Sequence, residues 1–383
     1  MKAFRYKIRR PSKAVVQRFE QTLDLCRELY NAGLQERRDA WKLNRVSLSY
    51  FDQANKLGAI KAVRDDLKTV HSQVLQDVLK RLDKTFKAFF SRIKQGGKAG
   101  FPRFKGKNFF ASFCFPQSGF KLIGDKLTLA KIGTMRIRLS REIEGQVKTC
   151  TIKREVDGWY VIFTAETEKE LLAKTGDSIG LDVGLENFAT LSNGEQIANP
   201  RFLRVSERRL KTAQRAVSRK KKGGNCRKKA VRLLQKQHLK IKRQRTDFLH
   251  KTANSIVARF DEIAVENLHI RNMVKNHHLA KSIADASWGN FLQYLEYKAE
   301  NAGKRVWKVN PNGTSQTCLC GASVKKSLSV RHHQCSHCGL SLPRDIVSAK
   351  VILKRAVGPT VEELTYGNSH RVSSEFPAIT ASV

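Results

Sequence analysis

Three acidic residues that lie far apart in the sequence share similar local settings. Asp182 and Glu266 each end a short apolar run, and Asp345 opens a segment with helical periodicity. Reactive groups collect at the carboxyl ends of strands in open α/β sheets, so we expect these three carboxylates to meet. Each acid taken alone also fits a structural role, as a turn residue, a strand cap or a helix start.

Acids clustered in this way would have a defined chemistry. Three neighbouring carboxylates repel one another unless cations lie between them, and hard oxygen ligands with open positions suit Mg²⁺ or Mn²⁺. Two such ions about 3.5–4 Å apart can activate water and stabilise the leaving oxygen of a phosphodiester. We therefore predict a hydrolytic site in which two Mg²⁺ ions are held by the catalytic groups Asp182, Glu266 and Asp345.

Four of the eight cysteines fall close together in two pairs. The pairs are Cys318-Leu-Cys320 and Cys335-Ser-His-Cys338, with 14 residues between them. Four thiolates in two knuckles predict one closed, structural Zn²⁺ site. The first pair has only one residue between its cysteines, which strains a normal knuckle. If Cys320 cannot reach the metal, His332, His333 or His337 could replace it as a ligand. The remaining alternatives are four free thiols or a former zinc finger that no longer binds metal.

The charge balance points to a polyanionic partner. The chain carries 73 Lys and Arg against 34 acids, a formal net charge of +39. Such an imbalance causes self-repulsion and is typical of nucleic-acid binding. No run approaches the roughly 20 apolar residues of a membrane helix, and the N-terminus lacks the apolar core of a signal peptide. We expect a cytoplasmic, nucleoid-associated protein without membrane contact.

The positive charge is concentrated in residues 204–245, which hold 18 Lys or Arg and one acid. A break at Gly223-Gly224 predicts a helical hairpin whose basic faces contact phosphates, although a basic run can also be a solvated face. The candidate phosphate ligands are Arg208, Arg209, Arg215, Arg219, Lys220, Lys221, Lys222, Arg227, Lys228 and Lys229. Arg103 and Lys105, interleaved with aromatics, are further candidates, and so are Gln73 and Gln76 on a predicted helix face.

The N-terminal half shows two kinds of pattern. Residues 2–9 suit a strand, and apolar steps of three and four residues then predict helices from Pro11 to near Gly33, over about 47–66 and over about 70–94. We interpret 11–95 as an all-helical unit inserted into a small β-barrel. The later strands of that barrel are expected at 109–115, 119–123, 126–130, 134–138, 147–155 and 159–166.

The C-terminal half suits an α/β sheet. A strand over 178–184 carries Asp182, and a hairpin follows over 185–197 with its turn at Asn193-Gly194. Further strands are expected at 263–268 and 305–309, and helices at 288–302 and 345–356. An acid-bearing first strand that leads into a hairpin is typical of an RNase H-like sheet. We expect 272–285 to be a loop and 358–383 to be a disordered tail.

Several motifs occur in the order found in one known family. They are Gly180-Leu-Asp-Val-Gly-Leu-Glu-Asn-Phe-Ala-Thr-Leu191, Val265-Glu-Asn-Leu268, Thr314-Ser-Gln-Thr-Cys318 and Arg344-Asp345. In these motifs the chain resembles TnpB proteins, the transposon-encoded relatives of type V CRISPR effectors. The resemblance implies an RNA-guided DNA endonuclease with one RuvC-like site at Asp182, Glu266 and Asp345. The chain departs from the family at Pro343, where an acid is common, and at Val347, where Asn is expected.

The resemblance also implies an α+β multidomain organisation. Its parts are a β-barrel wedge domain (1–10 and 96–170), a helical recognition domain (11–95), a RuvC-like nuclease domain of RNase H-like fold (171–316 and 341–357), a zinc-binding target-nucleic-acid module (317–340) and the tail (358–383). The implied partners are a guide RNA and target double-stranded DNA, cut beside a short adjacent motif by a monomeric ribonucleoprotein. A nuclease-inactive RNA-guided repressor, a strand-transferring transposase and a plain RNA-binding protein remain alternatives.

Overall fold

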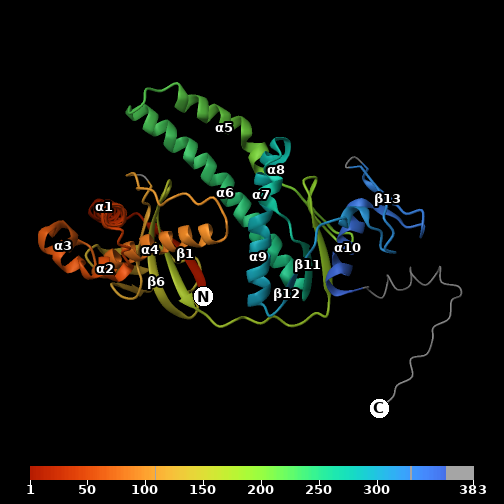
Figure 1. Cartoon of the computed structure of the whole chain (residues 1–383), viewed down its shortest axis with the longest axis horizontal. Helices are drawn as coiled ribbons and strands as arrows, with labels where there is room; N and C mark the ends of the chain where they lie inside the picture. Colours follow the sequence, from red (N-terminus) through yellow and green to blue (C-terminus); the bar gives the residue numbers. More distant parts are fainter. Residues whose placement is uncertain (108, 328–329, 359–383) are drawn as a thin grey trace, which may run out of the picture. The chain divides into compact units, whose positions relative to one another are not determined.

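The computed structural model describes residues 1–107, 109–327 and 330–358, so the predicted tail from 359 onward lies outside the described residues. The chain divides into two compact units, Met1–Glu168 and Lys169–Val383 (Figure 1). Among the described residues, none of the helices combines the length and the apolar character needed to cross a membrane.

The first unit is built on a seven-stranded antiparallel sheet. Its strand order is β2-β6-β7-β1-β5-β4-β3, so the N-terminal strand lies in the middle of the sheet, between strands that come much later in the chain. No hydrogen-bonded ladder joins the edge strands β2 and β3 within the described residues, and a closed barrel stays a prediction. The strands are β1 (Lys2–Arg9), β2 (Ser112–Phe115), β3 (Phe120–Ile123), β4 (Lys126–Leu129), β5 (Gly133–Arg138), β6 (Gln146–Glu155) and β7 (Gly158–Glu166).

The helices of this unit are inserted between β1 and β2. They are α1 (Lys13–Asn44), α2 (Tyr50–Asn55), α3 (Leu57–Val63), the 3₁₀ turn η1 (Asp65–Thr69) and α4 (Ser72–Lys94). The prediction that the first helix ends near Gly33 is wrong. A Cβ at Gly33 would lie 3.1 Å from the side chains of Leu79 and Leu82, so this glycine allows α4 to approach α1 closely inside a continuous helix.

The second unit contains a five-stranded sheet of order β10-β9-β8-β11-β12. Strands β10, β9 and β8 are antiparallel neighbours, whereas β8, β11 and β12 run parallel. The strands are β8 (Ser178–Val183), β9 (Asn187–Leu191), β10 (Gln196–Ala198), β11 (Glu262–Glu266) and β12 (Arg305–Val309). The turn between β9 and β10 lies at Asn193-Gly194, where Gly194 has a φ of 93°, as the sequence indicates.

Helices cover both faces of this sheet. The helices are α5 (Phe202–Ser218), α6 (Asn225–Arg259), α7 (Ile270–Met273), α8 (His277–Ala286), α9 (Trp288–Asn301) and α10 (Arg344–Val357). One face packs against α6 and α9, and the other packs against α10. Helices α5 and α6 form a hairpin whose tip projects beyond the sheet (Figure 1). The loop expected over 272–285 is wrong, because Asn276 caps α8 and Ile283 anchors that helix in the core.

A small module separates β12 from α10. It begins with the 3₁₀ turn η2 (Thr314–Gln316) and contains the two-stranded ribbon of β13 (His332–Gln334) and β14 (Ser341–Pro343). Its apolar core includes Leu319 and Leu340, and it continues into Val347 and Val351 of α10. The module therefore packs directly on the helix that carries Asp345.

Candidate functional site

Strand alternation places two of the predicted acids on one face of the sheet. In β8, Ile179 and Leu181 enter the core shared with α6 and α9, so Gly180 and Asp182 lie on the opposite face. In β11, Ile263 and Val265 enter the same core, which leaves Glu266 on the face of Asp182. The two strands are parallel neighbours, and their carboxyl ends therefore bring both acids to the same edge.

Helix α10 brings the third acid to this face. Asp345 lies in its first turn. The helix lies so close to β8 that a Cβ on Gly180 would be 2.1 Å from the backbone oxygen of Ala349. Only glycine permits this approach. This role of Gly180 was not predicted from the sequence, although Gly180 is the first residue of the motif over 180–191.

The charges of the three acids interact. Burial is the main cause that raises the pKa of Asp182 well above its ordinary value, and the negative charges of Glu266 and Asp345 raise it further, while Arg344 opposes them. Burial also raises the pKa of Glu266, against the lowering effects of the Thr314 hydroxyl and of Arg355. Asp182 is half-buried, and its carboxyl feels the charges of two other acids, a setting that favours a bound cation.

Two neighbours orient the outer acids. The buried Thr314 hydroxyl donates a hydrogen bond to Glu266 Oε1, and Arg344 Nε lies 3.2 Å from Asp345 Oδ1. The role of Thr314 was not apparent from sequence, because it starts a short turn far from Glu266. Val347, which stands where the family pattern has Asn, is buried in the core of the small module and does not face the acids.

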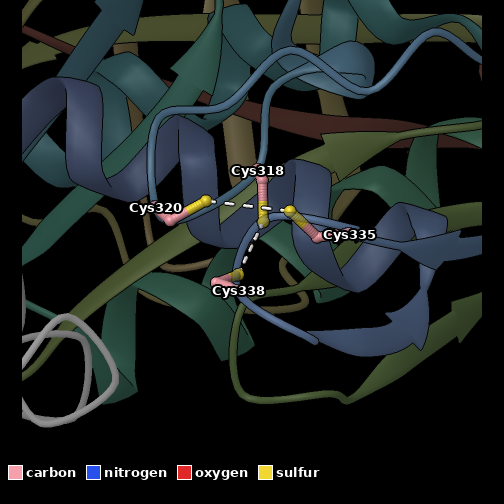
Figure 2. A group of neighbouring side chains, drawn as sticks. All are labelled: Cys318, Cys320, Cys335 and Cys338. Atoms are coloured by element: carbon pink, nitrogen blue, oxygen red, sulfur yellow. Dashed lines mark hydrogen bonds between the residues drawn. The ribbon is translucent and has the colours of Figure 1, made fainter. Parts of the chain in front are cut away.

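The four cysteines come together as predicted (Figure 2). Their sulfur atoms all lie within 4.8 Å of one another, and in the described part of the chain no other group of three or more His, Cys, Asp or Glu ligands lies as close together, Asp182, Glu266 and Asp345 included. Cys318 Sγ is 3.6 Å from Cys338 Sγ, and Cys320 Sγ is 3.8 Å from Cys335 Sγ. Four thiolates about 2.3 Å from one Zn²⁺ would be separated by about 3.8 Å, so the cluster fits this ion.

The short first pair still forms a complete knuckle. Cys318 N donates to Ala322 O at 2.9 Å, and Gly321, with a φ of 91°, turns the chain directly after Cys320. The second pair uses the same device, since Gly339 follows Cys338 with a φ of 70°. A left-handed glycine thus turns the chain directly after the second cysteine of each pair, and the one-residue gap between Cys318 and Cys320 does not prevent this turn.

The histidines do not replace a cysteine. His333 is fully buried and contacts Lys326 through Nδ1, outside the sulfur cluster. Burial tends to raise the pKa of Cys335, but the backbone N–H groups of Cys338 and His337 outweigh this effect and lower that pKa to about 7. Cys335 thus favours the thiolate, the form that binds zinc, whereas burial raises the pKa of Cys338 in the same knuckle.

The predicted phosphate ligands divide into exposed and structural residues. Most are exposed along the α5–α6 hairpin or in the loop after α4: Arg103, Arg208, Arg209, Arg215, Arg219, Lys220, Lys221, Lys222, Lys228 and Lys229. Arg227 instead donates to Val217 O at 2.7 Å and caps the end of α5. Gln73 anchors Ser118 through a 2.9 Å bond to its backbone N–H, whereas Gln76 is exposed. Lys105 is half-buried, with its ammonium 5.8 Å from the Tyr30 ring.

Known families match most of this chain. A probable transposase model (OrfB_IS605) matches residues 161–277, a Cas12f1-like TNB domain model matches 288–352, and a helix-turn-helix domain model matches 1–45. A putative RNA-guided DNA endonuclease of Streptomyces pristinaespiralis is 34% identical over 363 residues, which cover 92% of this chain and 88% of the relative. The chain belongs to the TnpB family.

Other relatives of this TnpB protein span different lengths. The putative RNA-guided DNA endonuclease InsQ of Escherichia coli is 30% identical over 92% of each chain. A TnpB-like protein of Methanocaldococcus jannaschii is 31% identical over 37% of this chain and 32% of its own length. A solved Cas12f1–sgRNA–target DNA complex aligns over 92% of this chain and 98% of that chain, at 16% identity and a TM-score of 0.34, which is too low to carry an argument.

Proposed function

We propose that this TnpB protein is an RNA-guided DNA endonuclease that hydrolyses phosphodiester bonds at one RuvC-like site formed by Asp182, Glu266 and Asp345. The observation that carries this proposal is the placement of Asp182 and Glu266 at the carboxyl ends of neighbouring parallel strands, with Asp345 in the first turn of the helix that packs on β8. The pKa of Asp182, which burial and both other acids raise, agrees with this placement. Three carboxylates from β8, β11 and α10 thus share one electrostatic site. The strand order, with three antiparallel strands followed by two parallel ones, supports an RNase H-like sheet.

The donor set of this site fits divalent cations. All three ligands are hard carboxylate oxygens, which suit Mg²⁺. A divalent cation at such a site supplies activation of water and stabilisation of the leaving oxygen. The protein contributes orientation: Thr314 fixes Glu266 through its hydroxyl, and Arg344 lies beside Asp345.

The other parts of the chain fit roles in the same reaction. The basic α5–α6 hairpin supplies phosphate contacts for a guide RNA, and pairing of the guide with one DNA strand supplies sequence specificity. The first unit corresponds to the wedge domain with its helical recognition insert, which would read a short duplex motif next to the target. The cysteine cluster corresponds to a zinc-stabilised target-nucleic-acid module.

The decisive experiment compares the native protein with Asp182→Ala, each co-expressed with its transposon RNA. With Mg²⁺ and a matching target, the native complex should cut both strands, and Asp182→Ala should bind the target without cutting it. Cutting by Asp182→Ala at the native rate would refute the site. Joining of a cut end to another DNA would instead indicate a strand-transfer enzyme, and binding without cutting by the native protein would indicate a repressor.

A further inference from the structure

A polar cavity of about 390 Å³ lies between the turn after β8, the start of α5 and the segment before β13. Arginine is the commonest residue in its lining, which includes Arg201, Arg204 and Arg331. Arg204 belongs to the basic segment 204–245 and Arg331 to the cysteine-bearing module, both predicted to touch nucleic acid, whereas Arg201 was not a predicted ligand. A cavity of this size suits one nucleotide unit.

Two walls of the cavity adjoin two of the proposed catalytic acids. Leu185 lines one wall and follows Asp182 by three residues. Arg331 lines another, and its backbone oxygen accepts a 2.8 Å hydrogen bond from the N–H of Arg344, the residue before Asp345. A strand that enters the cavity would therefore lie next to the acid cluster.

The lining of the cavity carries more positive than negative charge, because three arginines stand against the carboxylates of Glu186 and Asp285. Arg204 has no side-chain partner among the residues that the structure describes. Arg331 pairs with Glu186 at 3.4 Å, but both side chains are more than half exposed, and such pairs are weak. Asp285 also lines the cavity, but its carboxylate is already occupied, because it accepts from the N–H of Leu203 and pairs with Arg245 at 2.8 Å.

The third arginine is held in an uncommon backbone conformation. Arg201 has a φ of 46° and a ψ of 48° in the left-handed region, which is unfavourable for residues other than glycine. Its N–H donates to Asn199, and its guanidinium donates to Leu185 O at 3.1 Å. Asn199 donates to the same oxygen at 3.0 Å. The turn after Asp182 is thereby fixed to the cavity wall, and strain of this kind concentrates at functional sites.

We propose that this cavity binds the phosphodiester backbone of the DNA strand beside the bond that is cut, with Arg204 and Arg331 as the phosphate ligands. Guanidinium groups bind phosphate oxygens in a bidentate manner, so one unpaired and one weakly paired arginine suit this ligand. Arg331 exchanges Glu186 for the phosphate when DNA enters. The inference rests on the proposed nuclease function, because that function places the scissile bond at Asp182.

The first test uses substrates in which one phosphate near the cut is replaced by a neutral methylphosphonate. In the native complex, the neutral linkage at one position should slow single-turnover cleavage about 10-fold. Arg204→Ala should be slowed by a similar factor, and the same neutral linkage should then have no further effect, because both changes remove one contact. Equal slowing by the neutral linkage in the native protein and in Arg204→Ala would overturn the inference.

Two further variants separate phosphate binding from a structural role. Arg204→Lys should recover part of the lost rate, and Glu186→Gln should lower the DNA concentration for half-maximal cleavage, since it frees Arg331 from its competitor. Weaker DNA binding by Glu186→Gln would contradict the exchange. Thermal unfolding and guide-RNA content should match the native protein in all three variants.

Measuring DNA binding in a protein that cannot cut tests the phosphate site separately from the nuclease site. In an Asp182→Ala background, Arg204→Ala should reduce the slope of log affinity against log salt for a short single-stranded oligonucleotide by about 1. If Asp182→Ala abolishes cutting but Arg204→Ala changes neither slope nor rate, the cavity assignment fails alone. If Asp182→Ala still cuts while the slope changes, the nuclease site fails and the phosphate site stands.

Discussion

Replacing Gly180 by alanine tests how the third acid reaches the other two. The added Cβ would lie 2.1 Å from Ala349 O and 2.9 Å from Leu353 Cβ, whereas ordinary contact begins at 3.4 Å. Helix α10 would have to move away from β8 by about 1.3 Å, the difference between 3.4 and 2.1 Å. Overpacking of this kind costs about 1–3 kcal/mol, and a displacement of about 1 Å at a reacting group can cost about 100-fold in rate.

The assay measures two quantities on the same protein. Urea unfolding should show the loss of about 1–3 kcal/mol in the free energy of unfolding. Single-turnover cleavage of a target by the guide-loaded complex should fall about 100-fold, because Asp345 moves with α10. Addition of Mg²⁺ at higher concentration should recover only part of the rate, since the displaced helix and not the cation concentration limits the reaction.

Gly58→Ala is the matched control. Gly58 lies in α3, and a Cβ there would meet nothing within 4 Å. The same chemical change should leave cleavage unaltered and should raise stability by up to about 1 kcal/mol, because alanine favours a helix. Cleavage by Gly180→Ala within about threefold of the native rate would refute the argument that close packing of α10 builds the site.

Three further predictions follow from the same contacts. Asp182→Asn should abolish cleavage yet stabilise the cation-free protein at pH 7. The raised pKa of Asp182 means that its ionised form destabilises the fold, and the native-to-variant difference in urea unfolding should shrink as pH falls toward the ordinary value of about 3.9. Metal analysis of Cys320→Ser should show loss of zinc, and the variant should also cut more slowly, because the module packs on α10. Cys226 is exposed and lies outside the cluster, so Cys226→Ser should retain zinc. Arg227→Ala should increase hydrogen exchange at the end of α5, while Lys228→Ala should leave exchange unchanged and reduce the salt slope of RNA binding by about 1.

Local pattern in the sequence was sufficient for most elements of the fold. Alternating and three-to-four-residue periods predicted β8, β12, α4 and α9 to within a few residues of their observed bounds. These patterns are reliable because they reflect contacts within one strand or helix and burial of one face. Gly33 shows the limit of such reasoning. A glycine that ends a helix and one that admits a neighbouring helix look alike until that neighbour is in place.

The sequence by itself determined which residue types are available for chemistry: three acids in suitable local settings, four thiols in two pairs and a strongly basic segment. Tertiary structure alone decided that Gly180 admits α10, that Gly321 turns the chain directly after Cys320, and that Arg204 lines a cavity in which its side chain has no partner among the described residues. The physical reason is that each of these facts depends on atoms brought together from distant parts of the chain. Their approach is fixed by packing and charge in the folded state, which no local period encodes.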